Sequence, residues 1–562
     1  MTNPLLRADA LPAFDEIRPE HVQPAIDTLL ATTDAALERA VGPDTPADYD
    51  AVSSVLDTAA EHLRFVWGAI GHLNAVADTP ALRAAYNDAL PKVTEQSSRH
   101  AADERLYAKY KAIAKNAACG GSTSSLTPAR KQALSNAMRD FVLAGAELQG
   151  EAKQRFQRLQ ELQADLSQKF SEHVLDATDG YACYASTEEL AGVPADAREA
   201  SRAAAAAEGK AGHKVTLHFP SYFPVMQYGE NRALRERLYT ANATRASEMG
   251  PPDQDNSEVM RELIRLRQEE ARLLGYPSYA DVSLVPKMAA SPRQVMDFLR
   301  DLAGRARPHA QRDLAELREF ARTELGIDDL QAWDVPFASG KLKEARYAFS
   351  DQEVKQYFTE PKVLEGLFRI IETLFEVAIR PDSAPVWHPS VRFFRIERPA
   401  EPGSDGPAEL VGQFYLDPYA RPGKRPGAWM DEVRGRWARP EGRLQTPVAQ
   451  LVCNFTPPLP GKAALLSHDD VTTLFHEFGH GLHHMLTQVD DIGVAGISGV
   501  EWDAVELPSQ FMENFCWEWD VVKRLTAHAD TGEPLPRELF DRMLAAKNFQ
   551  SEIGRASCRE RV

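Results

Sequence analysis

The sequence predicts a mainly α-helical protein with one small β-sheet. Apolar residues recur at helical spacing over long stretches such as 19–40 and 292–325. Short segments that read as strands are few, and three of the four fall between residues 391 and 455. A further helical stretch, which contains His476 and His480, follows soon after. This order along the chain predicts that the small sheet lies beside that helix.

The helices are expected to begin close to the N-terminus. Residues 15–115 read as helical. Thr127 is a suitable N-cap and Pro128 suits a first helical turn, so a long helix or a bent pair is expected over 127–175. Further helices are expected over 258–274 and 292–325.

Four segments read as strands, and the first of them alternates apolar and polar residues. In the first of them, the apolar positions are Val215, Leu217 and Phe219. The four segments are 214–219, 391–396, 410–416 and 448–455. Two segments rich in Pro and Gly, 401–407 and 417–429, are expected to be surface loops.

The composition argues against nucleic acid and membranes as partners. The chain has 64 Lys and Arg against 82 Asp and Glu, a formal charge of −18, which repels phosphate backbones. No apolar run approaches the length of about 18 residues that spans a membrane. The first residues lack the basic and apolar regions of a signal peptide. We therefore expect a cytoplasmic protein, and we expect it to be a monomer.

The cysteines also favour a reducing compartment. There are five of them among 562 residues, an odd number, and no two form a C-x-x-C pair. A disulfide framework is therefore not expected. The five are Cys119, Cys183, Cys453, Cys516 and Cys558.

Residues 476–480 read His-Glu-Phe-Gly-His, the H-E-x-x-H pattern in which two histidines of one helix can bind a zinc ion. Positions four apart on a helix lie about 40° from each other on one face, so both imidazoles can reach one ion. Glu477 lies beside them, near enough to hydrogen-bond a metal-bound water. A surface helix with two solvated histidines is the alternative explanation of the same five residues.

The residues around this motif predict an amphipathic helix. Asp469 and Asp470 suit its first turn, where carboxylates stabilise the helix dipole. One arc of the helix is apolar and lies nearly opposite the two histidines. One face can therefore pack into the core while the other presents the histidines to a cleft. The apolar arc consists of Val471, Leu474, Phe475, Phe478, Leu482 and Met485.

The third ligand distinguishes the classes of zinc site. The metzincin continuation requires a glycine and a histidine where this chain has His483 and Leu486, so that class is excluded. Catalytic zinc can instead take two histidines and one carboxylate and keep one position open for water. Glu506, in the sequence V-E-L-P-S-Q, lies 26 residues after His480 and is the candidate. By spacing alone its rivals are Glu501, Asp503 and His483.

The residues after Glu506 read as a second helix. Glu506, Gln510 and Glu513 then share one face, at positions i, i+4 and i+7. From that face Glu513 can orient a ligand histidine by hydrogen bonding to it. Asp503 is a weaker candidate for the same supporting role.

Taken together, H-E-F-G-H and V-E-L-P-S-Q resemble the thimet oligopeptidase family of zinc metallopeptidases. Five other stretches share this resemblance, which extends from Asn3 to about Ser551. The resemblance implies that Glu506 is the third zinc ligand. The five stretches are N-P-L-L (3–6), I-R-P-E-H-V (17–22), G-Q-F-Y-L-D-P-Y (412–419), G-A-W-M (427–430) and C-N-F (453–455).

The same resemblance implies a zincin-type helical ellipsoid split by a deep central channel, with one zinc ion on the channel floor. Residues 1–210 are expected to form one helical wall of the channel, and residues 211–551 the catalytic region. Gly493, Gly496 and Gly499 lie between the two zinc helices, in a run that the resemblance makes a mobile loop near the substrate. From the sequence alone, a flexible connector explains this run equally well.

The expected activity is zinc-dependent hydrolysis of short oligopeptides, such as signal-peptide fragments and other intermediates of degradation. Glu477 is expected to take a proton from a zinc-bound water and to deliver one to the leaving amine. Two other hypotheses stay open. One is a helical protein that binds metal or peptide without chemistry, against which the intact Glu477 argues. The other is a different metal hydrolase, such as a deformylase or an aminopeptidase, which residues 505–510 disfavour.

Residues 552–562 depart from the sequence before them. Their apolar residues do not continue the helical spacing of the preceding sequence, and they read like the translation of a sequencing adaptor. We expect this tail to be foreign to the gene. The resemblance implies that family members continue well past this point with residues that bind substrate, so a chain that stopped here would be impaired.

Overall fold

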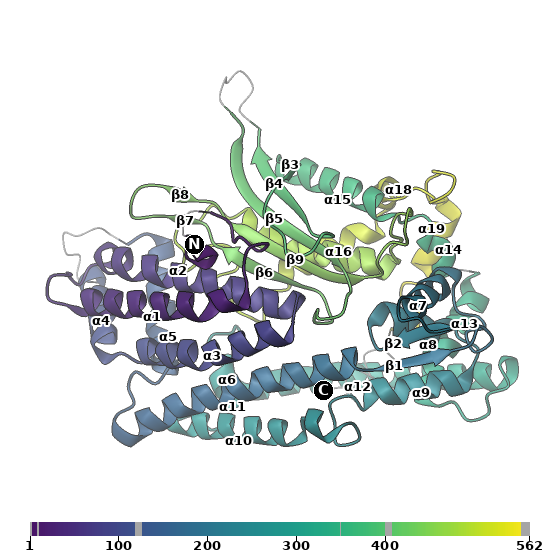
Figure 1. The fold of residues 1–562 in the computed structure, drawn as a ribbon, viewed down its shortest axis with the longest axis horizontal. Coiled ribbons are helices and arrows are strands. Elements are labelled where there is room, and N and C mark those ends of the chain that lie inside the picture. Colours follow the sequence, from purple (N-terminus) through teal and green to yellow (C-terminus); the bar gives the residue numbers. More distant parts are fainter. Residues whose placement is uncertain (1–2, 8–9, 119–125, 349, 400–406, 552–562) are drawn as a thin grey trace.

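The fold is mainly helical, with one five-stranded sheet near the middle of the molecule (Figure 1). The structure, a computed structural model, describes residues 3–7, 10–118, 126–348, 350–399 and 407–551. The prediction of a mainly α-helical fold with a small sheet is therefore confirmed. The expected loop at 401–407, apart from its last residue, and the tail at 552–562 lie outside the described residues, as do Cys119 and Cys558.

The N-terminal part is a bundle of long helices. The helix expected over 127–175 is a pair, and Thr127 caps its first member by accepting a hydrogen bond from the Arg130 N–H, as predicted. Helix α6 packs against α3 and α10 along the lower edge of Figure 1. These helices are α1 (Pro19–Val41), α2 (Tyr49–Val76), α3 (Pro80–Ala101), α4 (Glu104–Ala118), α5 (Pro128–Leu143) and α6 (Gly150–Asp179).

The middle of the chain adds a two-stranded sheet and more helices. The strand expected over 214–219 ends earlier, at Thr216, because Pro220 lies in the first turn of the next helix, where its fixed φ favours helix formation. The strands are β1 (Ala182–Ala185) and β2 (His213–Thr216). The helices are α7 (Ala195–Ala207), α8 (Phe219–Tyr228), α9 (Arg232–Ala243), α10 (Ser257–Leu273), α11 (Tyr279–Leu284), α12 (Pro292–Glu324), α13 (Val335–Tyr347), α14 (Asp351–Lys355) and α15 (Glu360–Phe375).

The five-stranded sheet has the order β3-β4-β5-β9-β6. Strands β5 and β9 are parallel, and the other neighbours are antiparallel. The strands expected at 391–396, 410–416 and 448–455 are present as β4, β5 and β9. The loop expected over 417–429 is shorter, because β5 runs on to Tyr419 and β6 begins at Trp429. The bounds are β3 (Ala378–Asp382), β4 (Arg392–Arg398), β5 (Glu409–Tyr419), β6 (Trp429–Arg434) and β9 (Val448–Phe455), with a separate pair, β7 (Trp437–Ala438) and β8 (Leu444–Gln445).

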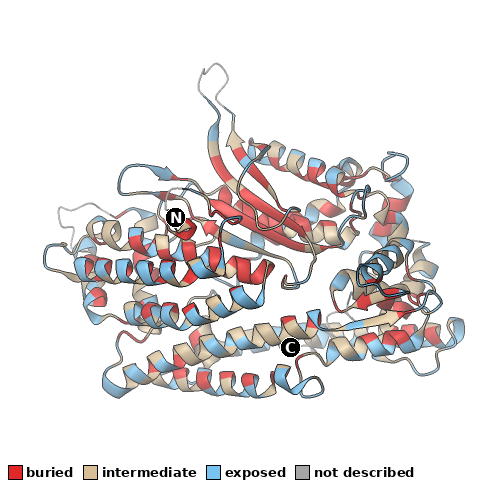
Figure 2. Ribbon diagram, viewed as in Figure 1, coloured by how far each residue is buried: buried red, intermediate tan, exposed pale blue. Residues whose placement is uncertain are grey.

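Both faces of the sheet are covered, so its central strands are buried almost throughout (Figure 2). Phe393 and Tyr415 pack with residues of α1 and α2 on one face. Phe394 and Phe414 pack on the other face with α15 and with α16 (His468–Met485). Burial on two faces explains why β5 and β9 carry buried residues on both sides, without strict alternation of apolar and polar residues. The last helices are α17 (Leu507–Glu513), α18 (Trp519–Leu525) and α19 (Arg537–Ala545).

Within the ranges that the structure describes, no helix is both long and apolar enough to cross a bilayer. The three cysteines in these ranges, Cys183, Cys453 and Cys516, are all free thiols.

Helix α16 is expected to depend on Phe478 for its attachment to the sheet. This side chain is fully buried, and its ring contacts Phe414 at 5.3 Å and Phe368 at 5.9 Å between centroids. Phe478→Ala should destabilise the fold by about 3–5 kcal/mol, the usual effect of such a cavity. The measurement is the midpoint of urea unfolding. Phe375→Ala, at an exposed position of α15, should shift it little, and equal shifts for the two variants would contradict this packing.

Candidate metal centre

Helix α16 begins with a strong local signal. Ser467 is its N-cap and accepts a hydrogen bond from the Asp470 N–H, while the Asp470 carboxylate accepts one from the Ser467 N–H. This reciprocal pair is a capping box. Asp469 and Asp470 lie in the first turn, as predicted, where the helix dipole favours negative charge.

The two faces of α16 are separated as the sequence predicted. The apolar arc from Val471 to Met485 is buried against the sheet. His476 and His480 lie on another face, where their side chains keep 26% and 14% of their accessible surface. Their ring centroids are 4.9 Å apart. The helix therefore presents two neighbouring imidazoles to solvent from a buried support.

Glu506 brings a carboxylate to these imidazoles. Its Oε2 atom lies 3.2 Å from His476 Nε2 and 3.1 Å from His480 Nε2. Ligand atoms of the three residues lie within 4.8 Å of one another, and among the described residues this is the one group of three or more metal-binding side chains. The group does not include the other candidates by spacing, which are Glu501, Asp503 and His483.

Asp503 is engaged elsewhere. Its two carboxylate oxygens accept hydrogen bonds from the backbone N–H groups of Met288 and Ala289, both at 2.9 Å. These bonds lower the pKa of Asp503. Asp503 thus holds the segment before α12 instead of supporting a histidine ligand.

Gly479 lets α17 approach α16 closely enough to deliver Glu506. A Cβ atom at this position would overlap with Ser509 Cα and would lie 2.5 Å from the backbone oxygen of Pro508. Any larger residue would therefore push the start of α17, and Glu506 with it, away from the histidines. The sequence alone gives no sign of this role, although the glycine is part of H-E-F-G-H.

Two residues of α17 hydrogen-bond to the cluster. Glu513 Oε1 accepts a hydrogen bond from His476 Nδ1 at 2.7 Å. Because a carboxylate only accepts, the Nδ1 proton is fixed and the Nε2 lone pair is left for a metal. The Ser509 hydroxyl lies 3.0 Å from Glu506 Oε2. Glu513 was singled out from the sequence, whereas Ser509 was not.

Glu477 is the buried acid of the cluster. Only 4% of the residue is exposed, and its Oε2 atom has no hydrogen-bond partner among the described residues. Burial raises the pKa of Glu477 to about 7, the charge of Glu506 adds to the rise, and His476 opposes it. A buried oxygen without a partner fits a group that receives a proton from a bound water.

The neighbouring histidines are held neutral. Burial lowers the pKa of His480 and of His483. Burial also lowers the pKa of His484 to about 4, and its Nε2 hydrogen-bonds to the Arg434 backbone oxygen at 3.1 Å. Neutral imidazole is the form that binds metals, and two imidazoles with one carboxylate fit a zinc site that keeps one position open.

The glycine-rich run between the two helices packs against its surroundings. A Cβ atom at Gly496 would lie 2.9 Å from the His484 backbone oxygen, and one at Gly499 would lie 2.8 Å from Asn136 Nδ2. Asn136 belongs to α5, and Gly493 faces Ala133 of that same helix. The run thus connects the end of α16 to the N-terminal bundle, and its role near a substrate stays a prediction.

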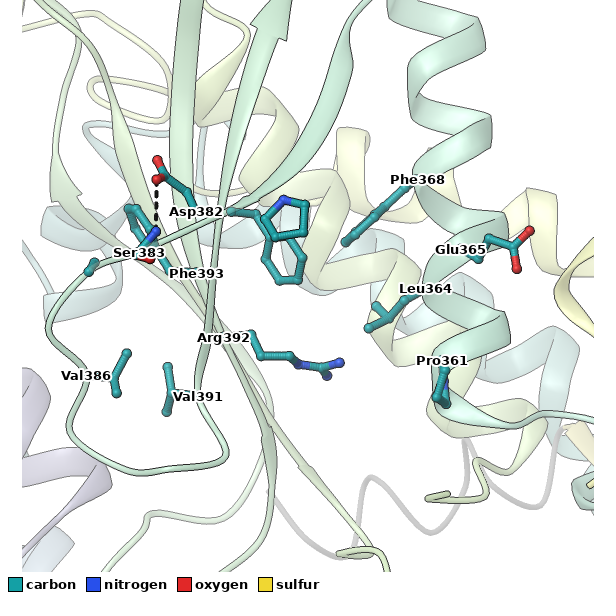
Figure 3. Close-up of a pocket in the computed structure, with 13 residues that line it drawn as sticks. Pro361, Leu364, Glu365, Phe368, Asp382, Ser383, Val386, Val391, Arg392 and Phe393 are labelled. Carbon is teal, nitrogen blue, oxygen red and sulfur yellow. Dashed lines mark hydrogen bonds between the residues drawn. The ribbon is translucent and has the colours of Figure 1, made fainter. Parts of the chain in front are cut away.

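A separate cavity of about 650 Å³ lies between α15 and the β3–β4 end of the sheet. Figure 3 shows Leu364 and Phe368 of α15 facing Arg392 of β4 across it. The charge of Arg392 is paired with Glu360. No member of the histidine and glutamate cluster lines this cavity, so it is not part of the candidate metal centre.

Two family models match the chain. The model of Peptidase family M3 matches residues 225–557, which include α16, α17 and all of the cluster. The model of the Neurolysin/Thimet oligopeptidase N-terminal domain matches residues 26–153.

Curated proteins show the same similarity over almost the whole chain. Oligopeptidase A of Salmonella typhimurium is 47% identical over 98% of this chain and 80% of its own length. Oligopeptidase A of Escherichia coli is 46% identical over the same shares. An organellar oligopeptidase A of Arabidopsis thaliana is 39% identical over 98% of this chain and 70% of its own.

Solved structures share the fold at low sequence identity. PZ peptidase A with an inhibitor has a TM-score of 0.51 at 15% identity, over 96% of this chain and 74% of that chain. A Bacillus anthracis protein assigned as an oligoendopeptidase F has a TM-score of 0.50 at 14% identity, over 94% and 75%. These similarities support the mainly α-helical, zincin-type fold.

The contact at Gly479 should be essential for the geometry of the cluster. Gly479→Ala is expected to separate α17 from α16 and to weaken metal binding by more than tenfold, because Glu506 would move with α17. Metal affinity is measured by competition with a chromophoric chelator. Gly304→Ala is the matched control, since it is also a helical glycine and a Cβ there meets nothing within 4 Å. Unchanged affinity in Gly479→Ala would contradict the close-contact argument.

Proposed function

The chain belongs to peptidase family M3 and is a metalloendopeptidase, and on this premise we propose that it uses one zinc ion to hydrolyse short oligopeptides. The observation that carries the proposal is the convergence of His476, His480 and Glu506 beside the buried Glu477. The names of the oligopeptidase A relatives support peptides as substrates.

We propose His476 Nε2, His480 Nε2 and a Glu506 oxygen as the zinc ligands. The donor set supports zinc, because two imidazoles and one carboxylate with an open position are typical of catalytic zinc. The Glu513 carboxylate at His476 Nδ1 supports it further, since such a partner orients a ligand imidazole.

Glu477 is the proposed general base and acid. When bound, zinc supplies a water of lowered pKa and polarises the scissile carbonyl. Glu477 then accepts the proton of that water at its unpaired Oε2 and returns a proton to the leaving amine. Its position beside both histidines on the rigid helix α16 keeps the carboxylate close to the reacting groups.

The same proposal implies where the substrate channel lies and which parts of the chain form it. The substrate channel has to run along the side of α16 that carries the histidines, because the sheet covers its other side. We propose that residues 1–210 form one wall of this channel and residues 211–551 the catalytic region. A cytoplasmic monomer that degrades peptide fragments is the setting that we propose.

Replacing the base tests the proposed reaction directly. Glu477→Gln should lower the turnover of an internally quenched peptide by about 10²- to 10⁴-fold, because the amide cannot take a proton. The variant should still bind one zinc ion per chain. Glu518→Gln, an exposed carboxylate beyond α17, is the control and should match the parent.

The substrate should carry a blocked N-terminus, which an endopeptidase tolerates and an aminopeptidase does not. Turnover by Glu477→Gln within tenfold of the parent would show that another group is the base. A parent that binds zinc and cleaves no peptide would instead favour a metal-binding protein without chemistry.

Removing the third ligand tests the zinc site. Glu506→Ala should weaken zinc binding by more than the factor of about 10–100 that is typical when a residue hydrogen-bonded to a ligand is replaced. Asp503→Ala should leave the affinity close to that of the parent, because its carboxylate holds Met288 and Ala289. Dissociation constants come from chelator competition, and the reverse order of the two variants would refute the assignment of Glu506.

A further inference from the structure

We infer that Ser509 is a positioning residue that fixes the metal-binding oxygen of Glu506. The inference rests on the zinc site proposed above and adds one residue to its support. Ser509 is the third residue of α17 and is completely buried. Its hydroxyl lies 3.0 Å from Glu506 Oε2 and 2.9 Å from the Glu506 backbone oxygen.

Glu506 needs such a partner because its side chain is half exposed, at 51% of its accessible surface. An exposed glutamate samples several rotamers, and attraction to two imidazoles does not by itself select one oxygen. The Ser509 hydroxyl selects Oε2, which is also the oxygen closest to both histidines. The carboxylate is therefore held in a binding geometry before any metal arrives.

The hydroxyl itself is held by the backbone of two helices. Gly479 of α16 packs closely against the backbone at Pro508 and Ser509, so the Ser509 Cα cannot move closer to α16. Helix α16 is in turn packed on β5, β6 and β9. A rigid path thus runs from the sheet through Gly479 and Ser509 to the carboxylate oxygen.

A purely structural role for Ser509 makes a different prediction. Its hydroxyl also reaches the carbonyl three residues earlier, a local bond that many serines make in helices. If that bond were its whole contribution, its loss would alter the stability of the fold and leave the metal affinity of the folded protein unchanged. Metal affinity and unfolding of the metal-free chain therefore separate the two roles.

The test is Ser509→Ala in the full chain. We expect its zinc affinity to fall about 10- to 100-fold, as for other residues that orient a ligand. The urea midpoint of the metal-free protein should move little, and the visible absorption bands of the cobalt(II)-loaded protein should shift, because the carboxylate loses its fixed orientation. Ser509→Thr retains the hydroxyl and should recover part of the affinity.

Ser54→Ala is the matched control, because the Ser54 hydroxyl also bonds to the carbonyl three residues earlier, that of Ala51, in α2 and far from the histidines along the chain. It should bind zinc as the parent does. Equal zinc affinity of Ser509→Ala and the parent would overturn the role inferred for Ser509 and leave the proposed metal site standing. A parent that binds no zinc would overturn the metal site itself.

Discussion

The approach of α17 to α16 at Gly479 is the contact on which the candidate site depends. Glu506 stands at the start of a short helix, 26 residues after His480, so a contact between this helix and α16 is needed to bring it to the histidines. Gly479 of α16, which has no side chain, makes this contact with the backbone at Pro508 and Ser509, and the close packing leaves no space for α17 to come nearer. The 3.1 and 3.2 Å separations between the Glu506 oxygen and the two imidazoles follow from this contact.

The sheet gives this contact a fixed frame. Strands β4, β5 and β9 are covered by the N-terminal helices on one face and by α15 and α16 on the other, so α16 cannot shift without opening a close-packed core. The histidines and Glu477 are carried on this helix, and the glycine-rich run links its end to α5. The reactive groups thus lie on the most buried helix, while the more exposed Glu506 is supplied from α17.

Local patterns explain which features were predictable. The start of α16, its apolar arc and the strands β4, β5 and β9 were predicted, because capping residues and double-sided burial leave clear marks in the sequence. Strands β3 and β6 were missed, since they lie at the sheet edges and are only partly buried. Spacing left Glu501, Asp503 and Glu506 as candidates, because a connection of 21 to 26 residues can bring any of them to the site. His483 stayed a candidate because it lies three residues after His480 on the same helix. The contacts of Gly479 and Ser509 join two helices, and a single sequence does not show which positions of separate helices touch.

Diffraction at the zinc absorption edge, from crystals of the zinc-loaded full chain, tests the central claim most directly. The structure predicts one anomalous peak at about 2.0–2.2 Å from His476 Nε2, His480 Nε2 and an oxygen of Glu506. A peak bound by the two histidines without Glu506, or a peak at His483 and His484 instead, would contradict the account.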